Sequence, residues 1–470
     1  MNKGILGFGW NSIAQGYKVL FSSVILILLS RIISVEEFGI IGMSTVFVLF
    51  FNTLLNIGFD SSIIYSKTLK EEDLFSLFLL NLAIGVLIYA IGYASAPAIS
   101  NFYNNDEVQI IFRALIVGVL LSSFGVVSKG VLQKQLEFKK IAIIDLITVT
   151  LAGIVAVVLA LNDYGYWAII MQQLLTVGFA SIGYLVVSYK SIFKSISFSF
   201  NVLKAHLNFG YNVLIFNISN FFAQQLDVLL IGKLLGERET GLYVLAFNLI
   251  IKPVGLLVQV FNKTLYPILA KVDIDDLAKK YTEYTYLFFF TFSPLILFGI
   301  SLSQTLAPYI LTNKWDAILL LLIIFGYQSI RTIVASPSGI LFLITGKPKI
   351  QWRYSLFISI PLRFTGIFLG YYFLKSALGI AIGINVFATI EMIVGFYVTF
   401  KLVNLKILDY LNNFREDILS LSLLSVILAL LNKFIDYDWL LISVQCVFFT
   451  IFVLLKKQKL HNLLLKLKEL

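Results

Sequence analysis

Eight charged residues lie inside long apolar runs of this sequence, where a charge is costly. Placing one such side chain in a membrane costs about 2.5–3.5 kcal/mol, so it usually faces a cavity or a partner. The cations are Lys18, Arg113, Lys252, Arg331 and Arg363, and the anions are Asp145, Asp227 and Glu391. The surplus of cations favours an anionic ligand, because Arg donates paired hydrogen bonds to phosphate oxygens and Lys supplies a point charge.

Depth within the runs separates these candidates. Arg113 and Asp145 lie near the ends of their runs, where they can reach the membrane interface. We predict that the other cations bind substrate and that the other acids bind a coupling ion, H+ or Na+. The substrate-binding set is Lys18, Lys252, Arg331 and Arg363, and the ion-coupling set is Asp227 and Glu391. The alternatives are structural: an ion pair between Arg363 and Glu391, and an interhelical hydrogen bond from Asp227.

Neutral amides also recur in the apolar runs, and amides commonly bind sugar hydroxyls. They are Gln15, Asn52, Asn56, Asn81, Gln172, Gln173, Asn217, Asn220, Asn248, Gln259, Gln328 and Asn385. The alternative is that each one hydrogen-bonds to a neighbouring helix.

Residues for catalysis or metal binding are sparse. The sequence has no P-loop, so no ATP-driven motor is expected. The single Cys446 excludes an internal disulfide and a cysteine metal cluster, and His206 and His461 are too far apart to predict a zinc site. We expect no cofactor, no metal and no enzymatic activity.

The composition predicts the elements that hold these residues. Of 470 residues 59% are hydrophobic and 13% are charged, and the mean hydropathy is +0.91. A soluble domain has about 25% charged residues, so a membrane protein is expected. A crossing helix needs about 20 apolar residues, and we predict an all-α protein with about fourteen of them. The approximate segments are 13–33, 39–59, 74–96, 108–128, 141–161, 166–188, 211–232, 241–261, 284–306, 316–336, 354–374, 377–400, 416–433 and 438–456.

The positive charges predict the orientation. With the N-terminus inside, most of the 36 Lys and Arg fall in inner connections. The outer connections hold only Arg31, Lys233, Arg238, Lys314, Lys375 and Lys433. This asymmetry obeys the positive-inside rule. It places both termini in the cytoplasm and explains the net charge of +10 without nucleic-acid binding.

An internal repeat predicts two lobes. The segment SRIISVEEFGI from Ser30 matches GKLLGERETGL from Gly232, so that Gly39 pairs with Gly241. Six crossings separate the two segments, which gives the halves the same orientation, as in transporters with parallel repeats. We predict a six-helix lobe over 1–190, a cytoplasmic linker over 191–210 and a second six-helix lobe over 211–400. Two additional helices and a basic tail fill 401–470, and the substrate path lies in a central cavity between the lobes.

Three strings of residues resemble one family. RIISVEEFGIIGM from Arg31, NIGFDSSIIYSKTLKEEDL from Asn56 and LEFKKIAIID from Leu136 are similar to the Wzx-type polysaccharide flippases. More narrowly they resemble the branch that exports precursors of colanic and teichuronic acid, within the multidrug/oligosaccharidyl-lipid/polysaccharide exporter superfamily. The resemblance is clearest over residues 8–190.

That resemblance implies a function. The expected substrate is an undecaprenyl-pyrophosphate-linked oligosaccharide, moved across the bacterial cytoplasmic membrane by cation-coupled alternating access. A polysaccharide polymerase and the chain-length machinery are expected partners. Three alternatives stay open: a multidrug or cation exporter of the same fold, which predicts an acidic cavity; a polysaccharide polymerase or ligase, which needs larger external loops; and a non-transporting assembly protein.

Overall fold

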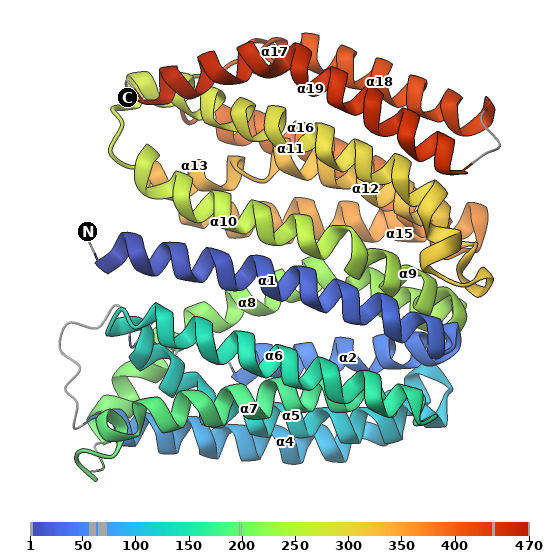
Figure 1. The fold of residues 1–470 in the computed structure, drawn as a ribbon. Coiled ribbons are helices and arrows are strands. Elements are labelled where there is room, and N and C mark those ends of the chain that lie inside the picture. Colours follow the sequence, from blue (N-terminus) through green and yellow to red (C-terminus); the bar gives the residue numbers. More distant parts are fainter. Residues whose placement is uncertain are drawn as a thin grey trace. The chain divides into compact units, whose positions relative to one another are not determined.

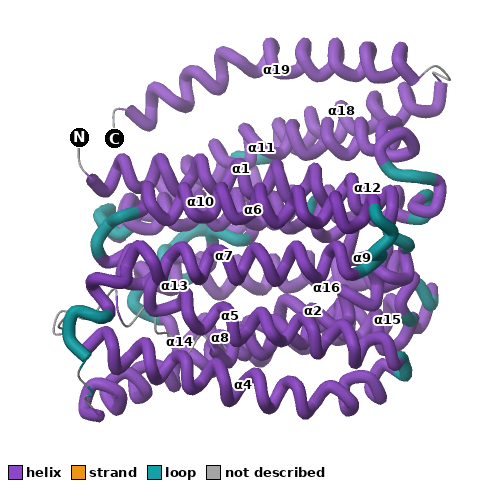
Figure 2. Tube along the Cα trace, turned by 60° about the horizontal axis from the view of Figure 1, so that its bottom comes forward, coloured by secondary structure: helices purple, strands orange, loops and turns teal. Residues whose placement is uncertain are grey.

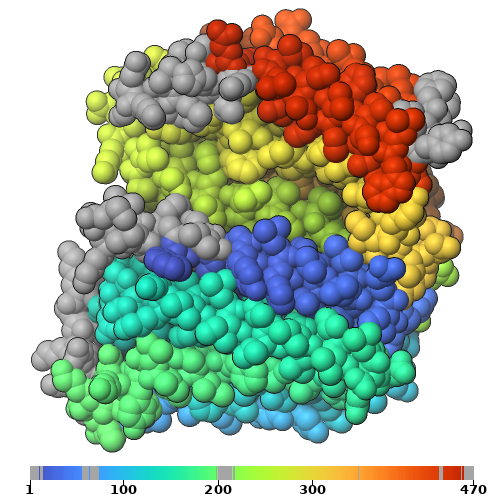
Figure 3. Space-filling model, in the orientation of Figure 1, coloured from blue at the N-terminus to red at the C-terminus, as the bar shows by residue number. Residues whose placement is uncertain are grey.

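The first compact unit of the protein, Met1–Val244, is a bundle of long helices. The computed structural model describes residues 3–55, 63, 73–196, 198, 200–434 and 438–468. In the first unit its helices are α1 (Lys3–Ile32), α2 (Val35–Leu55), α4 (Leu74–Tyr103), α5 (Asp106–Lys134), α6 (Phe138–Leu161), α7 (Trp167–Ile192), α8 (Phe200–Leu235) and the start of α9 (Glu237–Leu249). In Figure 1, α4, α5, α6 and α7 run side by side, and in Figure 3 α1 lies along α6.

Local capping explains where two of these helices begin. Ser34 and Glu37 form a reciprocal capping box at the start of α2: the Ser34 hydroxyl accepts from the Glu37 amide, and the Glu37 carboxylate accepts from the Ser34 amide at 2.9 Å. Glu37 also accepts from the amide of Tyr166 at 3.1 Å, which ties the start of α2 to the connection before α7. At α5 the Asn105 side chain accepts from the Glu107 amide.

The two matched glycines meet in a reciprocal contact between α2 and α9. A Cβ added at Gly39 would lie 1.8 Å from the carbonyl oxygen of Glu237. A Cβ added at Gly241 would lie 2.0 Å from the carbonyl oxygen of Val35. In the repeat alignment Gly39 matches Gly241 and Val35 matches Glu237, so each contact is the counterpart of the other. Only glycine permits backbones this close, which is how small residues join helices in membranes.

The second compact unit, Leu245–Leu470, contains shorter helices between the long ones. They are α10 (Ile251–Leu269), α11 (Ile274–Ile310), the 3-10 turn η2 (Asn313–Trp315), α12 (Ile318–Ala335), α13 (Ser338–Ile344), α14 (Pro348–Tyr354), the π-helix η3 (Ser355–Ser359), α15 (Ile360–Leu374), α16 (Ala377–Phe400), α17 (Ile407–Asn412), α18 (Arg415–Phe434) and α19 (Asp438–Lys468). Aromatic side chains dominate its core, where Tyr281, Phe400 and Tyr410 pack together.

The C-terminal pair α18–α19 packs against α11 (Figure 1). Polar side chains join the pair to α11 at three places along the helices. At one end, Asp417 accepts hydrogen bonds from Lys456 (2.7 Å), Lys459 (2.8 Å) and the hydroxyl of Tyr286. The Asp417 side chain is only 3% exposed, so the carboxylate of this ionic cluster is shielded from solvent. Burial lowers the pKa of Lys459, but its hydrogen bonds to Asp417 and Tyr286 outweigh burial and hold that pKa above its ordinary value.

Amides make the second tie and a tyrosine the third. Asn432 of α18 donates to Gln304 of α11 at 2.6 Å and accepts from Gln445 of α19 at 2.5 Å. At the far end Tyr309 of α11 hydrogen-bonds to Asp438 of α19. The three contacts fix the register of the α18–α19 pair on α11, because a shift along the helices would leave polar groups without partners in an apolar setting.

The helical membrane-protein prediction is confirmed. The residues that the structure describes form helices and connections without a strand, as Figure 2 shows. Among them, twelve helices are long and apolar enough to cross a membrane. All fourteen predicted segments overlap helices, but those in α8 and α18 are not among the twelve, so the count of fourteen stays a prediction. The compact units divide inside α9, and the predicted division at 190, 210 and 400 also stays a prediction.

Candidate functional site

Three of the predicted crossings in the second unit are broken helices. The first breaks at Ile250, between α9 and α10. The second breaks at Ser336 and Pro337, between α12 and α13. The third widens into the π-helix 355–359 before α15. Within a membrane, interrupted backbone is tolerated where it is buried in protein or lines a water-filled cavity, and π-helical turns are frequent at functional sites.

Each broken helix carries one of the predicted substrate-binding cations. Lys252 lies in the first turn of α10 and is exposed; its ammonium group contacts the Asn248 side-chain oxygen at 3.3 Å, across the break. Arg331 lies in the last turns of α12, and Arg363 lies in the first turn of α15. Broken helices with charged residues beside the break are typical of binding sites in transporters, since helix ends and side chains there face the substrate.

Arg331 is held by the backbone of α16. Its Nη1 donates to the carbonyl oxygen of Ala388 at 3.0 Å. Its Nε is buried, and no acceptor for it lies among the residues that the structure describes. The charges of Glu391 and Arg363 are its electrostatic neighbours. Within the described part of the chain, no direct ion pair joins Glu391 to Arg331.

A second side chain contacts the same turn of α16. The hydroxyl of Tyr354 donates to the carbonyl oxygen of Glu391 at 2.5 Å. Gly395 makes room for it, since a Cβ at that position would lie 2.9 Å from the Tyr354 hydroxyl. Arg331 and Tyr354 therefore fix the turn between Ala388 and Glu391, and they leave the Glu391 carboxylate outside both hydrogen bonds.

Glycines and amides fix the helices that carry this cluster. Gly366 and Gly370 of α15 lie against Gly383 and Gly379 of α16: added Cβ atoms would fall 2.0–2.7 Å from the facing carbonyl oxygens. The side chains of Gln328 and Asn385 meet at 3.3 Å and join α12 to α16. The structure thus carries Arg331 and Arg363 on two helices, α12 and α15, that both pack against α16, the helix of Glu391.

The other two predicted residues lie in the first unit. Asp227 of α8 is 1% exposed and accepts a hydrogen bond from the Tyr243 hydroxyl of α9 at 2.7 Å. This is the interhelical hydrogen bond that is the alternative to an ion-binding role. Lys18 is half-buried on α1, next to Tyr17, whose hydroxyl bonds to Thr150 of α6.

Two charged residues that we placed near run ends have partners inside the first unit. Asp145 is 7% exposed and accepts a hydrogen bond from the Tyr184 hydroxyl of α7. Arg113 lies over the ring of Tyr93, 4.7 Å from its centroid. Sequence reasoning missed both pairs, because each partner lies on another helix and no residue spacing in the sequence predicts the contact.

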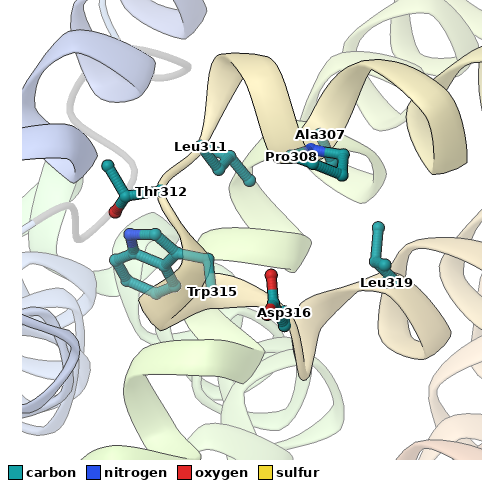
Figure 4. Close-up of a pocket in the computed structure, with 7 residues that line it drawn as sticks. All are labelled: Ala307, Pro308, Leu311, Thr312, Trp315, Asp316 and Leu319. Atoms are coloured by element: carbon teal, nitrogen blue, oxygen red, sulfur yellow. The ribbon is translucent and has the colours of Figure 1, made fainter. Parts of the chain in front are cut away.

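A small pocket lies away from this cluster. It is formed where α11 ends and α12 begins, and it is lined by Pro308, Leu311, Trp315, Asp316 and Leu319 among others (Figure 4). The described cations do not line it, so it does not belong to the predicted anion site.

The described helices define a polytopic helical membrane protein. The family of polysaccharide biosynthesis proteins matches residues 28–320, and the chain belongs to this family. It is 25% identical over 434 residues to the lipopolysaccharide biosynthesis protein WzxC of Escherichia coli (strain K12), covering 90% of this chain and 84% of WzxC. It is 24% identical over 349 residues to the teichuronic acid biosynthesis protein TuaB of Bacillus subtilis (strain 168), covering 74% of this chain and 72% of TuaB.

A solved structure shares the fold. The lipid II flippase MurJ in its inward closed conformation superimposes with a TM-score of 0.72 at 15% identity, over 95% of this chain and 99% of MurJ. The predicted resemblance to the Wzx-type branch is confirmed by these matches, and the transporter fold is confirmed by the likeness to MurJ.

Proposed function

We propose that this protein is a flippase for lipid-linked oligosaccharides in surface polysaccharide biosynthesis. The carrier lipid is undecaprenyl pyrophosphate, the membrane is the bacterial cytoplasmic membrane, and both termini are cytoplasmic. The observation that carries the proposal is the group of cations on broken helices, Lys252, Arg331 and Arg363, in a member of the polysaccharide biosynthesis family. The names of WzxC and TuaB place those relatives in polysaccharide pathways, and that of MurJ describes a lipid flippase.

The substrate's charge gives the cations their role. A pyrophosphate diester carries negative charge through the membrane, and an uncompensated charge there is costly. Arg331 and Arg363 would each donate to phosphate oxygens, with Lys252 and Lys18 adding positive charge. The polyprenyl tail stays in lipid, and the protein changes access between the two leaflets without making or breaking a covalent bond.

A coupling ion would set the direction of substrate transport across the membrane. We assign H+ or Na+ binding to Asp227 and Glu391, as the acids that lie deepest in the predicted crossings. An ion biases two states only by binding one of them more tightly.

The test is made in cells that lack this protein. Undecaprenyl-linked oligosaccharides are extracted, and their leaflet is determined by accessibility to an external probe. Complete repeat units trapped on the cytoplasmic side, with surface polymer restored by the wild-type gene, support the proposal. Repeat units that reach the outer leaflet but stay unpolymerised refute it and point to a polymerase or assembly partner.

A further inference from the structure

Arg113 of α5 is a cation of the first unit that the proposed transport path does not use. It lies seven residues after Asp106, where α5 begins, and this spacing is about 10 Å along a helix. The 29 residues of α5 span about 44 Å, whereas the hydrocarbon of a bilayer is about 30 Å thick. With the excess length shared between the two ends, Arg113 lies just inside one edge of the hydrocarbon, close to the depth of the lipid headgroups.

The charge of Arg113 is not compensated within the described part of the chain. Its Nε is buried and has no acceptor there. Among the same residues no ion pair joins the guanidinium to a carboxylate. The acids at the start of α5, Asp106 and Glu107, lie about two helical turns away. Because an uncompensated cation in a membrane is costly, an anion from outside the chain would stabilise this side chain.

Tyr93 of α4 positions the guanidinium group. The guanidinium carbon of Arg113 lies 4.7 Å from the centroid of the Tyr93 ring, and Tyr93 is 43% exposed. An arginine that stacks on an aromatic ring keeps the N–H groups at its edge available for an anion. Close packing fixes the two helices beside the pair, since a Cβ added at Gly92 would lie 2.7 Å from the side chain of Ile116.

The surface around this pair is apolar and exposed. In Figures 1 and 2, α4 lies at the edge of the first unit. Its exposed side chains include Val86, Leu87 and Ile91, and Ile110 of α5 is exposed three residues before Arg113, on the same side of that helix. A contiguous apolar surface on a crossing helix contacts the acyl chains of lipids. A ligand therefore reaches Arg113 from the lipid.

We propose that Arg113 and Tyr93 form a binding site for the phosphate group of an anionic phospholipid. The phosphodiester oxygens accept hydrogen bonds from the Arg113 guanidinium, the Tyr93 hydroxyl donates to the same headgroup, and the acyl chains lie against the apolar surface of α4. A zwitterionic lipid brings its own cation and leaves the arginine uncompensated, so the site selects a lipid with net negative charge. This site goes beyond the proposed function and does not depend on it.

The test measures lipid binding to the purified full-length protein by native mass spectrometry. Delipidated protein is titrated with phosphatidylglycerol and, separately, with phosphatidylcholine of the same acyl chains. We expect the wild type to bind one phosphatidylglycerol about tenfold more tightly than phosphatidylcholine, since a hydrogen bond to a charged group contributes at least that factor.

Variants assign this preference to the site. Arg113→Gln should lose it, Arg113→Lys should keep part of it because the charge remains, and Tyr93→Leu should weaken it. The matched control is Arg238→Gln, which removes the same charge from an exposed arginine of the first unit that lies 4.0 Å from Glu36. This control should match the wild type.

Three results overturn the proposal: a wild type without the preference, an Arg113→Gln variant that retains it, and an equal loss in Arg238→Gln. If Arg113→Gln does not fold, an unchanged preference in both Arg113→Lys and Tyr93→Leu overturns it instead. Polyprenyl pyrophosphate is the competing probe. If it binds the wild type more tightly than phosphatidylglycerol and loses that affinity in Arg113→Gln, the occupant is the carrier lipid, which overturns the phospholipid site.

Discussion

The reciprocal contact of Gly39 and Gly241 gives a prediction whose size follows from the structure. Replacing Gly39 by Ala places a Cβ 1.8 Å from the Glu237 carbonyl oxygen, where an ordinary van der Waals contact begins at 3.4 Å. The obstacle is backbone, which no side-chain rotation can move away. The helices α2 and α9 must therefore part by more than an ångström along this contact.

Two free-energy terms compete in this variant. Overpacking costs about 1–3 kcal/mol, and more where backbone must move. Alanine is favoured over glycine in a helix interior by at most about 1 kcal/mol. Gly39→Ala should thus destabilise the protein by about 2 kcal/mol. Gly299→Ala is the matched control: this glycine also lies within a crossing helix, but nothing stands within 4 Å of its added Cβ, so stability should stay equal or rise slightly.

The two-fold character of the contact adds a sharper test. Gly241→Ala should cost about as much as Gly39→Ala, because its Cβ meets the Val35 carbonyl oxygen at 2.0 Å. The double variant should cost clearly less than the sum, since helices parted by the first methyl group already admit the second. Thermal unfolding in detergent measures all four variants. Gly39→Ala as stable as Gly299→Ala, or fully additive losses, would refute this reasoning.

Three further changes test the other contacts. Asp417→Asn should lower the free energy of unfolding by about 2–4 kcal/mol, because Lys456 and Lys459 lose their buried counter-ion. An unchanged thermal midpoint would show that this ion pair does not stabilise the protein. Gln445→Leu should lower the thermal midpoint, because it leaves the Asn432 side-chain oxygen without its donor. The control Ser443→Leu changes an exposed position on the same helix and should lower the midpoint less. Equal midpoints would show that the hydrogen bond between Gln445 and Asn432 is unimportant. Arg363→Ala should abolish most export and Arg363→Lys should retain part of it at equal protein level, whereas equal export by Arg363→Ala and wild type would remove this residue from the site.

The helices were predictable from the sequence because each crossing needs a continuous apolar run. The breaks were not. Pro253, Pro337 and Pro361 lie at or near the three breaks, but Pro294 and Pro97 lie inside unbroken helices. A proline removes one backbone N–H donor and leaves one carbonyl group without its partner. Whether the helix is interrupted there depends on whether neighbouring helices or side chains hydrogen-bond to that carbonyl group.

The candidate site was predictable in its residue types and only partly in its arrangement. Charge within apolar runs identified Arg331, Arg363 and Glu391, and the structure places them near one another. The hydrogen bond of Arg331 goes to the backbone carbonyl oxygen of Ala388 on α16, and any residue can supply a carbonyl. For that reason no pattern in the sequence could have predicted this contact.

The glycine pair illustrates the opposite case. Repeat alignment matched Gly39 to Gly241 before any contact was known. Segments related by a two-fold axis meet at equivalent positions where they approach that axis. The match therefore carried spatial information that single-residue properties lack.

We propose that this chain itself moves a pyrophosphate-linked lipid by means of its arginines. The most direct test reconstitutes the purified protein in liposomes that contain a fluorescent polyprenyl-pyrophosphate-linked oligosaccharide on both leaflets. Exposure of the inner-leaflet label to an external quencher is followed with time. Wild type should expose it many times faster than protein-free liposomes, and the Arg331→Gln/Arg363→Gln double variant should lose most of that rate. Equal rates for wild type and protein-free liposomes would contradict the account.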